Sequence, residues 1–425
     1  MTLVRVRPGP VRGTLRAPPS KSYTHRALAV AHLARHRFVI ERPLRSDDTL
    51  RTVDALRALG SAVTLGRTRW TVAPAGAPAR PTPVTIGCGE SGTTLRFASA
   101  LAALESRPVR LRGSGRLPYR PMAGMVRALT QLVVKVDAPE PPRSLPMTVR
   151  GPLRGGVVDV DASETSQFVS ALLLALPTAA GDSELRLGGA PVSAPYIAAT
   201  LAVLRASGIH VTARGGRYRI PGGQRYRARR FAVPGDASSA AYLWASAAIA
   251  GGSVTVERLP DRWPQADLAI LGLLEQFGAR VGRRWGGTTV AFGRRRPFRV
   301  SLTDAPDLYP LAGVLAASAD GESRLEGAPH VAAKESDRRA ETIRLARAMG
   351  ATVTEARGGL RIRGTGQPTP LSVRDADDHR VVMSAAVGAL AASGRSTIGR
   401  AEAVAKSFPD FWTVLGTLAG EGRVA

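Results

Sequence analysis

One pattern recurs six times along the chain and limits what the chain can fold into. Each copy begins with a small or acidic polar cluster and continues into a stretch rich in alanine and leucine. The intervals between corresponding polar residues are 71, 72, 73, 71 and 70 residues. The polar residues that mark the six copies are Ser20, Ser91, Ser163, Asp236, Asp307 and Asp377. This period is too long for the common solenoid repeats and favours six copies of one small α/β unit.

Each copy predicts a helix that begins at its polar cluster. Serine, threonine and aspartate can accept hydrogen bonds from the free N–H groups of a first turn, and alanine and leucine favour the helix that follows. β-like runs lie between the clusters, at 84–86, 109–111, 157–160, 253–256, 298–302 and 396–398. Second helices are predicted at 121–132, 196–206, 265–277 and 338–349, and the last three run into a glycine and a strand at 207–211, 278–281 and 350–353. The predicted unit is therefore β-α-β-α-β-β.

Six helix starts of this kind can act together on an anion. The N-terminus of a helix carries a partial positive charge and unpaired N–H donors. If the copies pack as two groups of three, with their helix starts toward a shared cleft, that cleft attracts anions. The alternative is six amphipathic helices with ordinary caps.

The residues at the helix starts add chemistry to this pattern. Lys21 and Arg26 lie five residues apart around the first start, so both can point toward a ligand. The loop 89–94 is rich in glycine and hydroxyl groups, which lets backbone N–H groups approach an anion, although it is not a Walker loop. Asp307 and the run 334–338 place carboxylates beside cations, as general acid–base chemistry on an anionic substrate requires. Solvated ion pairs and plain caps are the alternatives, and a structural cap is the simplest interpretation of Asp236.

The charge and cysteine content exclude several classes of protein. The net charge is +26, which fits either a nucleic-acid binder or an enzyme for small polyanions. The basic residues are scattered and aromatic residues make up only 5%, which favours solvated surfaces over a stacking platform. Cys88 is the only cysteine, so no disulfide framework forms within the chain. No apolar run approaches the roughly 18–20 residues of a membrane span, and the N-terminus lacks the apolar core of a signal peptide. We therefore expect a cytoplasmic protein.

The motifs taken together resemble those of the 5-enolpyruvylshikimate-3-phosphate synthase family. They follow the family order from residue 19 to residue 410, and the match is specific only as a set. The motifs are Pro19-Ser20-Lys21-Ser22 with Arg26, Ser91-Gly92-Thr93-Thr94-Leu95-Arg96, Arg120-Pro121, Ser166-Gln167-Phe168, Gly235-Asp236-Ala237-Ser238-Ser239, Lys334-Glu335-Ser336-Asp337-Arg338, Asp378-His379-Arg380 and Lys406-Ser407-Phe408-Pro409-Asp410.

The resemblance implies a fold and a division into domains. The family fold is a two-domain inside-out α/β barrel with three β-α-β-α-β-β units in each domain and helix N-termini facing the cleft between the domains. One domain then spans 20–234 and the other combines 1–19 with 235–425. Domain closure on the ligands would bring both sets of helix starts together and exclude water.

The resemblance also implies two substrates and a set of residues for each. The residues expected to hold phosphoenolpyruvate are Lys21, Gly92, Arg120, Gln167, Arg338, Arg380 and Lys406. The residues expected to hold shikimate 3-phosphate are Lys21, Ser22, Arg26, Thr165, Ser166, Gln167, Ser193, Tyr196, Asp307 and Lys334. Several cations suit a phosphate and a carboxylate, and hydroxyl groups suit a polyol.

The implied reaction is an addition followed by an elimination. Asp307 is the candidate base for the attacking hydroxyl, and Glu335, with Lys21 as a possible partner, is the candidate for proton transfer at C3 of phosphoenolpyruvate. A carboxylate among many cations should have a lowered pKa, which suits a base better than an acid. We expect no metal, no cofactor, no nucleic-acid partner and no membrane association, and a monomeric protein.

Some positions depart from the family pattern, and other proteins share its fold. Glu90 stands where many members have asparagine, His330 where an asparagine often contacts the shikimate phosphate, and Ala332-Ala333 where Arg-Val is usual. The nearest alternative is the sister transferase that acts on UDP-N-acetylglucosamine, which usually has a reactive loop cysteine and a Lys-Asn pair where this chain has Lys21-Ser22. A second alternative is a basic RNA-binding protein built on related units, since RNA 3′-phosphate cyclases share part of this architecture. Such a protein should lack the motifs at 334–338 and 406–410. A binding protein without activity is a third alternative.

Overall fold

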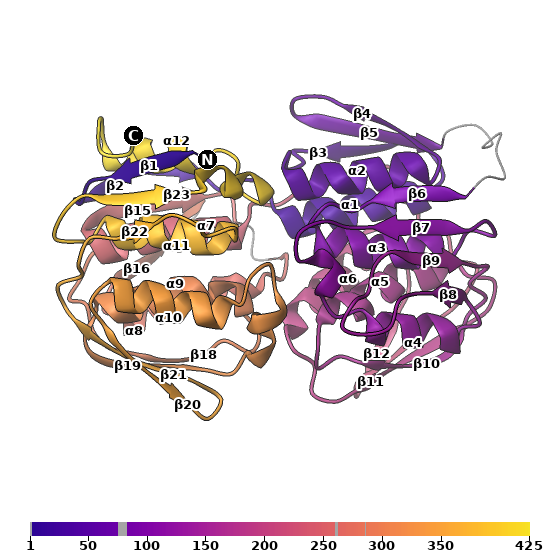
Figure 1. Cartoon of the computed structure of the whole chain (residues 1–425). Coiled ribbons are helices and arrows are strands. Elements are labelled where there is room, and N and C mark those ends of the chain that lie inside the picture. The colour runs from indigo at the N-terminus through magenta and orange to yellow at the C-terminus, as the bar shows by residue number, and fades with distance from the viewer. Residues whose placement is uncertain (1, 75–82, 260–261, 285) are drawn as a thin grey trace. The chain divides into compact units, whose positions relative to one another are not determined.

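The structure is a computed structural model that describes residues 2–74, 83–259, 262–284 and 286–425. The chain divides into two compact units (Figure 1). The C-terminal unit comprises Met1–Pro18, Gly235–Asp261 and Gln265–Ala425, and the N-terminal unit comprises Pro19–Pro234 and Arg262–Pro264. These limits differ from the predicted domain ranges at Pro19 and at 262–264. The parts of those ranges at 1, 75–82, 260–261 and 285 lie outside the described residues.

The N-terminal unit contains three four-stranded sheets with one shared topology. In each sheet a parallel pair of strands is extended by two antiparallel strands. The strand orders are β14 (Arg230–Ala232), β3 (Phe38–Glu41), β5 (Arg69–Pro74), β4 (Ser61–Leu65); β6 (Val84–Gly87), β7 (Val109–Arg112), β9 (Met147–Arg150), β8 (Lys135–Asp137); and β10 (Gly156–Asp161), β11 (Ser183–Gly188), β13 (Arg217–Ile220), β12 (Thr212–Arg214).

Helices fill the interior of this unit, and the sheets lie outside them (Figure 1). The first helices of the three copies pack against one another: α1 (Lys21–Leu33), α3 (Gly92–Ala102) and α5 (Ser166–Ala175). They are buried around most of their circumference. The remaining helices are α2 (Asp47–Ala58), α4 (Ala123–Gln131) and α6 (Ala194–Ala206), with short 3₁₀ turns η1 (Leu117–Tyr119) and η2 (Leu176–Thr178).

The C-terminal unit repeats this plan, but its last sheet is smaller. The strand orders are β16 (Arg280–Arg284), β17 (Gly287–Ala291), β15 (Gly252–Glu257), β2 (Val11–Arg16); β18 (Arg299–Ser301), β19 (Asp320–Glu326), β21 (Gly359–Thr365), β20 (Thr352–Ala356); and β22 (Ser372–Val373), β23 (Ser396–Gly399), β1 (Leu3–Val6). The last sheet has three strands where the predicted unit gives four, because β1 takes the antiparallel place beside β23 and no further strand follows among the described residues.

The inner helices of the C-terminal unit are α7 (Ala237–Ala250), α9 (Tyr309–Ser318) and α11 (His379–Ala389), which pack against one another. Every residue of α9 is buried. The other helices are α8 (Ile270–Gln276), α10 (Arg338–Ala348) and α12 (Phe411–Ala419), with 3₁₀ turns η3 (Ala266–Ala269), η4 (Pro306–Leu308), η5 (Pro329–Ala333) and η6 (Ala401–Lys406). Each unit has its own apolar core. The mixed α/β fold with six sheets agrees with the predicted fold class.

An exchange of strands explains why the N-terminal segment belongs to the C-terminal unit. Strand β2 precedes α1 in sequence but pairs in parallel with β15, which follows α7. Strand β14 precedes α7 but pairs in parallel with β3, which follows α1. Each unit thereby receives the parallel edge strand that its first copy would otherwise lack.

The predicted helix starts are correct in position, but three of the six marker residues do not occupy the cap position, and only two of the other three form a side-chain cap. Ser91 and Asp236 accept hydrogen bonds from Thr94 N and Ser239 N at 3.3 and 2.9 Å. Ser20 occupies a cap position without a side-chain cap bond.

The three exceptions have local causes. The Ser163 hydroxyl donates a hydrogen bond to Asp161 at 2.6 Å, and the helix begins three residues after Ser163, at Ser166. Asp307 lies inside η4, and its carboxylate forms ion pairs with Arg338 and Arg380. Asp377 pairs with Arg400, which leaves the cap of α11 to the next residue.

The strands predicted after the second helices begin later than expected. The strands predicted at 207–211, 278–281 and 350–353 are observed at Thr212, Arg280 and Thr352. Gly208, Gly278 and Gly350 adopt positive φ angles of 79°, 99° and 87°. The next residue donates its N–H back into the helix in each case, which is a common way to end a helix. The glycine and its neighbour therefore belong to the helix stop.

A short segment from the second half of the chain belongs to the N-terminal unit. Its Trp263 packs against Tyr23 and Phe231, with ring centroids 5.4 and 5.1 Å away. The Tyr23 hydroxyl donates to the Pro264 carbonyl at 2.7 Å. Burial raises the pKa of Tyr23 above its usual value, so the hydroxyl stays a donor.

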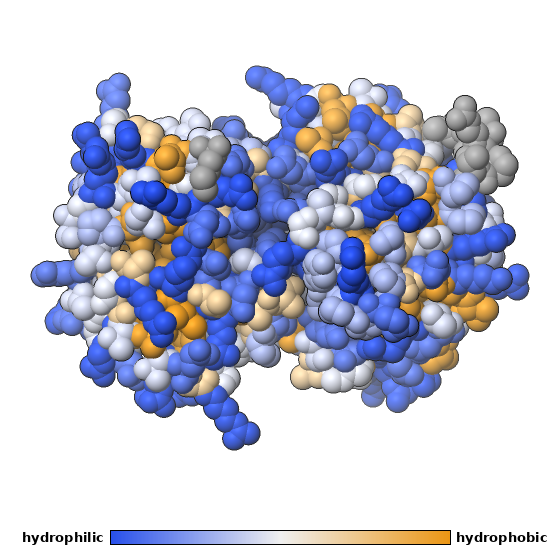
Figure 2. Space-filling model, in the orientation of Figure 1, coloured by the Kyte–Doolittle hydropathy of each residue, from blue (hydrophilic) through white to orange (hydrophobic). Residues whose placement is uncertain are grey.

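The surface is mainly hydrophilic on the face shown in Figure 2, with small separate hydrophobic patches. The large hydrophobic side chains that are exposed among the described residues are Leu3, Tyr119, Val133, Val157 and Phe292. None of the helices in the described part of the chain is both long and apolar enough to cross a bilayer.

Two histidines of α1, His25 buried and His32 partly buried, predict that acid destabilises the fold. The ring Nδ1 atoms of His25 and His32 lie 2.7 and 2.8 Å from the hydroxyls of Thr52 and Ser61. Burial, with the nearby Arg35 charge, lowers the pKa of His32 to about 4. Since the folded-state pKa lies below the unfolded value of about 6.5, the stabilising contribution is complete above pH 6.5 and is lost as the pH falls toward 4.

For His32 alone, we expect the free energy of unfolding to fall by roughly 2 kcal/mol between pH 7.5 and 5. Urea unfolding at both pH values measures this change. The H32Q variant should lose that part of the pH dependence, and H210Q, at an exposed histidine, should keep it. An unchanged pH dependence in H32Q would contradict the assignment.

Candidate functional site

The predicted site residues fall into two groups, one in each unit. The C-terminal group is Asp307, Lys334, Glu335, Arg338, Arg380 and Lys406, and the N-terminal group is Lys21, Ser22, Arg26, Gly92, Arg120, Thr165, Ser166, Gln167, Ser193 and Tyr196. Most members of both groups lie in the first turn of a helix or just before it.

Arg338, the first residue of α10, connects three carboxylates in the C-terminal unit. Its side chain is only 1% exposed. Nε lies 2.8 Å from Asp378, Nη1 lies 2.6 Å from Asp307, and Nη2 lies 2.7 Å from Glu335. These carboxylates come from three different helix starts, so one guanidinium fixes them relative to one another.

The charges in this cluster keep its aspartates ionised. Burial works to raise the pKa of Asp307, but Arg380, Arg338 and Lys334 together hold it well below the usual range. Burial likewise opposes the ionisation of Asp378, and Arg338 and then His379 lower its pKa. Asp307 is therefore a carboxylate at neutral pH and holds a proton poorly while both arginines face it.

Arg380, the second residue of α11, lies between two acids. Its Nη2 atom donates to Asp307 at 2.8 Å, and its Nη1 atom lies 4.0 Å from Asp267. Asp267 also accepts a hydrogen bond from Ser238 at the start of α7. Burial and then the Asp307 charge raise the pKa of Asp267 to about 6. Asp267 was not predicted as a site residue, because a single acid before an apolar run gives no distinctive pattern.

Three further residues surround this cluster. Lys406 Nζ lies 3.4 Å from the Asp377 carbonyl oxygen. Lys334 ends η5, close enough to Asp307 to lower the pKa of that carboxyl. Burial, and then the Lys334 charge, lowers the pKa of His330 to about 4, so its imidazole is neutral at pH 7. Neither imidazole nitrogen has a hydrogen-bond partner among the described residues.

The start of α3 in the N-terminal unit brings two arginines against a glycine. A Cβ atom built on Gly92 would lie 2.5 Å from Arg96 Nη1 and 2.6 Å from Arg120 Nη1. Arg96 also donates to Gln167 Oε1 at 3.0 Å, and the Gln167 amide donates to Thr93 at 3.3 Å. The absence of a side chain at Gly92 is what lets the guanidiniums lie beside the helix start.

Lys21, the first residue of α1, pairs with an acid that the sequence analysis did not select. Its Nζ atom lies 3.0 Å from Asp48 in the first turn of α2, and both side chains are mostly buried, at 16% and 13% exposed. The backbone carbonyl of Asp48 accepts from Thr94 at 3.2 Å. Asp48 thus links the starts of α1, α2 and α3. In the sequence, Asp48 is an acid in the first turn of a helix, and such acids are common in helices without a ligand.

Arg26, which its spacing to Lys21 predicts to face a ligand at this helix start, is hydrogen-bonded inside the N-terminal unit. It is 3% exposed, and it donates to Thr200 and to the carbonyls of Ser22 and Tyr196, each at 2.9 Å. Five positions in an α-helix correspond to about 500° of rotation, so a side chain five residues after Lys21 turns toward the helix bundle. Arg26 holds α1 against α6.

The remaining predicted residues of this unit lie at the starts of α5 and α6. The Thr165 hydroxyl caps α5 by accepting from Gln167 N at 3.2 Å. Ser166 is the first residue of the helix and is buried. Ser193 precedes α6 with a left-handed backbone, φ 57°, and its carbonyl accepts from Tyr196 N at 3.0 Å.

The metal and thiol chemistry of the chain is limited. The described residues contain no group of three His, Cys, Asp or Glu side chains arranged to hold a metal ion. Cys88 is buried, and burial raises its pKa to about 12, so its thiol is a poor nucleophile at neutral pH.

The fold and the two groups define a class of protein: an α/β protein of two three-sheet units with cations gathered at helix starts, suited to small polyanions. Residues 6–415 match the profile of the family described as EPSP synthase (3-phosphoshikimate 1-carboxyvinyltransferase). The chain belongs to this family.

Individual relatives agree over their full lengths. The chain is 42% identical over 403 residues to a 3-phosphoshikimate 1-carboxyvinyltransferase from Thermococcus kodakarensis, covering 95% of this chain and 96% of the relative. It is 38% identical to the protein of the same name from Methanocella arvoryzae, covering 99% and 100%. The structure of EPSP synthase from Acinetobacter baumannii superposes with a TM-score of 0.82 at 25% identity, covering 100% of this chain and 99% of that one.

Proposed function

We propose that this protein transfers the enolpyruvyl group of phosphoenolpyruvate to the 5-hydroxyl of shikimate 3-phosphate, releasing phosphate, as a step of the shikimate pathway. The observation that carries the proposal is the match to the 3-phosphoshikimate 1-carboxyvinyltransferase family over residues 6–415. The cations at the helix starts of both units supply the charge that two phosphorylated substrates require.

Phosphoenolpyruvate binding is assigned to residues of both units. In the N-terminal unit these are Lys21, Gly92, Arg120 and Gln167, and in the C-terminal unit Arg338, Arg380 and Lys406. Support comes from the Gly92 start, where two guanidiniums lie against the first turn of α3. Arginine can grip a carboxylate or a phosphate with two parallel hydrogen bonds. In this proposal, the site residues of the N-terminal unit and those of the C-terminal unit bind the same pair of substrates.

Shikimate 3-phosphate binding is assigned to hydroxyl and amide groups together with three cations. The residues are Lys21, Ser22, Arg26, Thr165, Ser166, Gln167, Ser193, Tyr196, Asp307 and Lys334. Arg26 also holds the backbone of Ser22 and Tyr196, since it donates to both carbonyls at 2.9 Å. His330, a neutral imidazole without a hydrogen-bond partner among the described residues, can donate one hydrogen bond to a phosphate oxygen.

Asp307 is assigned as the base that takes the proton of the 5-hydroxyl. In the substrate-free arrangement its low pKa makes it a weak base. An anionic substrate that engages Arg380 and Arg338 would weaken their pull on Asp307 and raise its pKa toward the working range. The attack forms a bond from the hydroxyl oxygen to C2 of phosphoenolpyruvate while C3 gains a proton. Loss of phosphate and of that proton then restores the double bond.

Glu335 is assigned to proton transfer at C3, with Lys21 as its partner. The Glu335 carboxylate contacts Arg338 at 2.7 Å. The same guanidinium contacts Asp307 at 2.6 Å, so the two acids are held at a fixed separation. This arrangement supports two separate roles, in which Glu335 transfers the proton at carbon C3 and Asp307 takes the proton of the hydroxyl oxygen.

The chemistry of Cys88 disfavours the sister transferase acting on UDP-N-acetylglucosamine. That enzyme usually has a reactive cysteine in a mobile loop. Cys88 is buried, directly after β6, and its raised pKa opposes thiolate formation. We further propose that the protein acts as a monomer in the cytoplasm without a nucleic-acid partner, which the dispersed basic residues support.

Gly92 predicts a specific defect in phosphoenolpyruvate binding. A methyl group in G92A would approach Arg96 and Arg120 to within 2.6 Å, so both guanidiniums would have to move. We expect KM for phosphoenolpyruvate to rise by roughly 10-fold or more, with KM for shikimate 3-phosphate changed by less than about 3-fold. Steady-state kinetics with each substrate varied in turn measures both constants. G272A, at a glycine of α8 where an added Cβ atom would meet nothing within 4 Å, is the matched control. Equal effects on both KM values would contradict the assignment.

Release of phosphate tests the proposed function. Purified protein should release phosphate only when both shikimate 3-phosphate and phosphoenolpyruvate are present, and D307A and E335A should abolish most of this release. If the folded wild-type protein releases no phosphate with this pair, the shikimate acceptor is wrong.

A further inference from the structure

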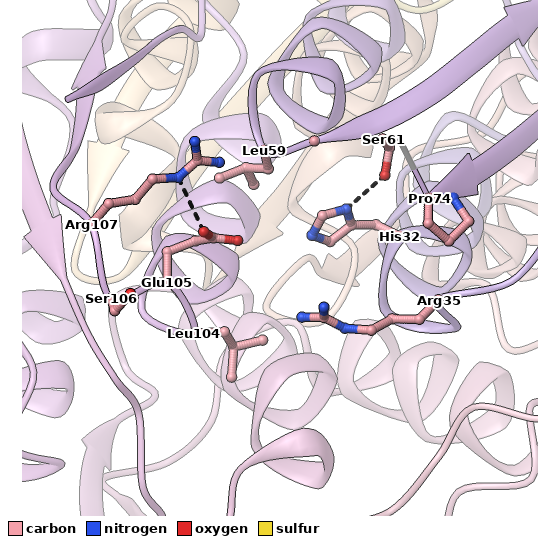
Figure 3. Close-up of a pocket in the computed structure, with 10 residues that line it drawn as sticks. His32, Arg35, Leu59, Ser61, Pro74, Leu104, Glu105, Ser106 and Arg107 are labelled. Carbon is pink, nitrogen blue, oxygen red and sulfur yellow. Dashed lines mark hydrogen bonds and ion pairs between the residues drawn. The ribbon is translucent and has the colours of Figure 1, made fainter. Parts of the chain in front are cut away.

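The N-terminal unit contains a pocket of about 330 Å³ away from the candidate site (Figure 3). It lies among the C-terminal ends of α1, α2 and α3 and the strands β4 and β5. The candidate residues Lys21 and Gly92 stand at the opposite ends of α1 and α3. His32 in the pocket is 11 residues from Lys21, or about 16 Å along the helix. The volume lies at the lower end of the range of small-molecule sites.

Two opposite charges point into this pocket without pairing with each other. In Figure 3 the Glu105 carboxylate and the Arg35 guanidinium point into it from different sides. Glu105 accepts from Arg107 Nε at 3.2 Å. Arg35 also lines the pocket, and within the described ranges it forms no ion pair with an acid. The pocket thus offers a negative group and a positive group to one ligand.

A third polar group in the pocket is neutral. His32 uses Nδ1 for the hydrogen bond to Ser61, and its other ring nitrogen points into the pocket in Figure 3. Its lowered pKa keeps the imidazole uncharged at pH 7. It can therefore exchange a hydrogen bond with a ligand without adding to the charge.

Apolar side chains complete the wall. Leu59 and Leu104, at the ends of α2 and α3, and Pro74, the last residue of β5, line the pocket between the polar groups. The C-terminus of a helix carries partial negative charge, so the end of α3, just before Glu105, favours a ligand cation there. At the end of α1, where the same charge would oppose a ligand carboxylate, the Arg35 cation offsets it.

From this arrangement we propose that the pocket binds a free α-amino acid with an aliphatic side chain. The ligand carboxylate lies at Arg35 and His32, its ammonium at Glu105, and its side chain against Leu59, Leu104 and Pro74. Arg107 already pairs with Glu105, but the Glu105 carboxylate still faces the pocket, so a simple anion would meet a negative group there. A simple amine would leave Arg35 without a counterion. A zwitterion satisfies both groups at once.

Isothermal titration calorimetry with L-leucine, L-isoleucine and L-valine tests the proposal on the full chain. At least one should bind, and for leucine two analogues should bind at least roughly tenfold more weakly: 4-methylpentanoate, which lacks the amine, and 3-methylbutylamine, which lacks the carboxylate. If none of the three amino acids binds, or if 4-methylpentanoate binds as tightly as leucine, the proposal is wrong.

Variants locate the bound amino acid. R35Q and E105Q should each weaken binding at least roughly tenfold, and R37Q and E140Q, at exposed positions outside the pocket, should leave it unchanged. R35Q is decisive if E105Q disturbs folding through Arg107. Binding should also be unchanged by saturating phosphoenolpyruvate and shikimate 3-phosphate. Competition with either substrate, or full affinity in R35Q, would overturn the proposal, and neither result depends on the proposed reaction.

Discussion

Replacing Arg338 with methionine should destabilise the C-terminal unit by about 3–5 kcal/mol and abolish most activity. The arginine is 1% exposed and contacts Asp307, Glu335 and Asp378 at 2.6–2.8 Å. Methionine fills a similar volume but leaves three carboxylates close together without their shared cation. Because that repulsion is buried, solvent screens it little.

Urea unfolding at pH 7 measures the loss, and a residue of the same helix serves as control. Arg344 pairs with Glu341 at 2.6 Å, but its side chain is 40% exposed. R344M should therefore cost less than about 1 kcal/mol. R338K should fall between the two variants, since an ammonium keeps the charge but cannot serve three acids with the geometry of a guanidinium. If R338M is as stable as R344M, the cluster does not hold the three helix starts together.

Replacing Asp307 with asparagine should lower kcat by roughly 10²–10⁴-fold. Asparagine preserves the shape of the side chain and can still accept a hydrogen bond from Arg380 or Arg338, but it cannot take a proton. Because the arginines remain, KM for phosphoenolpyruvate should change much less than kcat.

Steady-state kinetics with circular dichroism of each variant separates chemistry from folding. D320N, at an exposed aspartate of β19, should retain wild-type kcat. The activity that remains in D307N should also lose the acid limb of the wild-type pH profile, because the group that must be deprotonated is gone. A kcat within threefold of wild type would remove Asp307 from the role of base.

The sixfold pattern predicted much of the fold because it depends on local chemistry. Caps such as Ser91 and Asp236 are set by residues three positions apart, and the apolar length of α9 requires burial from every side. The exchange of β2 and β14 is different. Each strand pairs with a partner more than 190 residues from it in sequence, and no local signal distinguishes β15 from β3 as the partner of β2.

The candidate site was predictable where chemistry coincided with a motif. Arg338, Asp307 and Glu335, which the motifs select, lie together in the structure. Asp48 and Asp267 were missed because each looks like an ordinary acid near a helix start and gains meaning only from its tertiary partners, Lys21 and Arg380. The contacts of Arg26 could not be predicted because the pattern gave its spacing but not the helix against which it packs.

The fate of one oxygen atom tests the central claim most directly. Phosphoenolpyruvate labelled with ¹⁸O at the oxygen that bridges carbon and phosphorus is incubated with shikimate 3-phosphate and the wild-type protein. Addition and elimination at C2 break the carbon–oxygen bond, so the account predicts that the label leaves with the released phosphate and that an enolpyruvyl ether of shikimate 3-phosphate forms. Unlabelled phosphate, with no ether, would show cleavage at phosphorus and would contradict enolpyruvyl transfer.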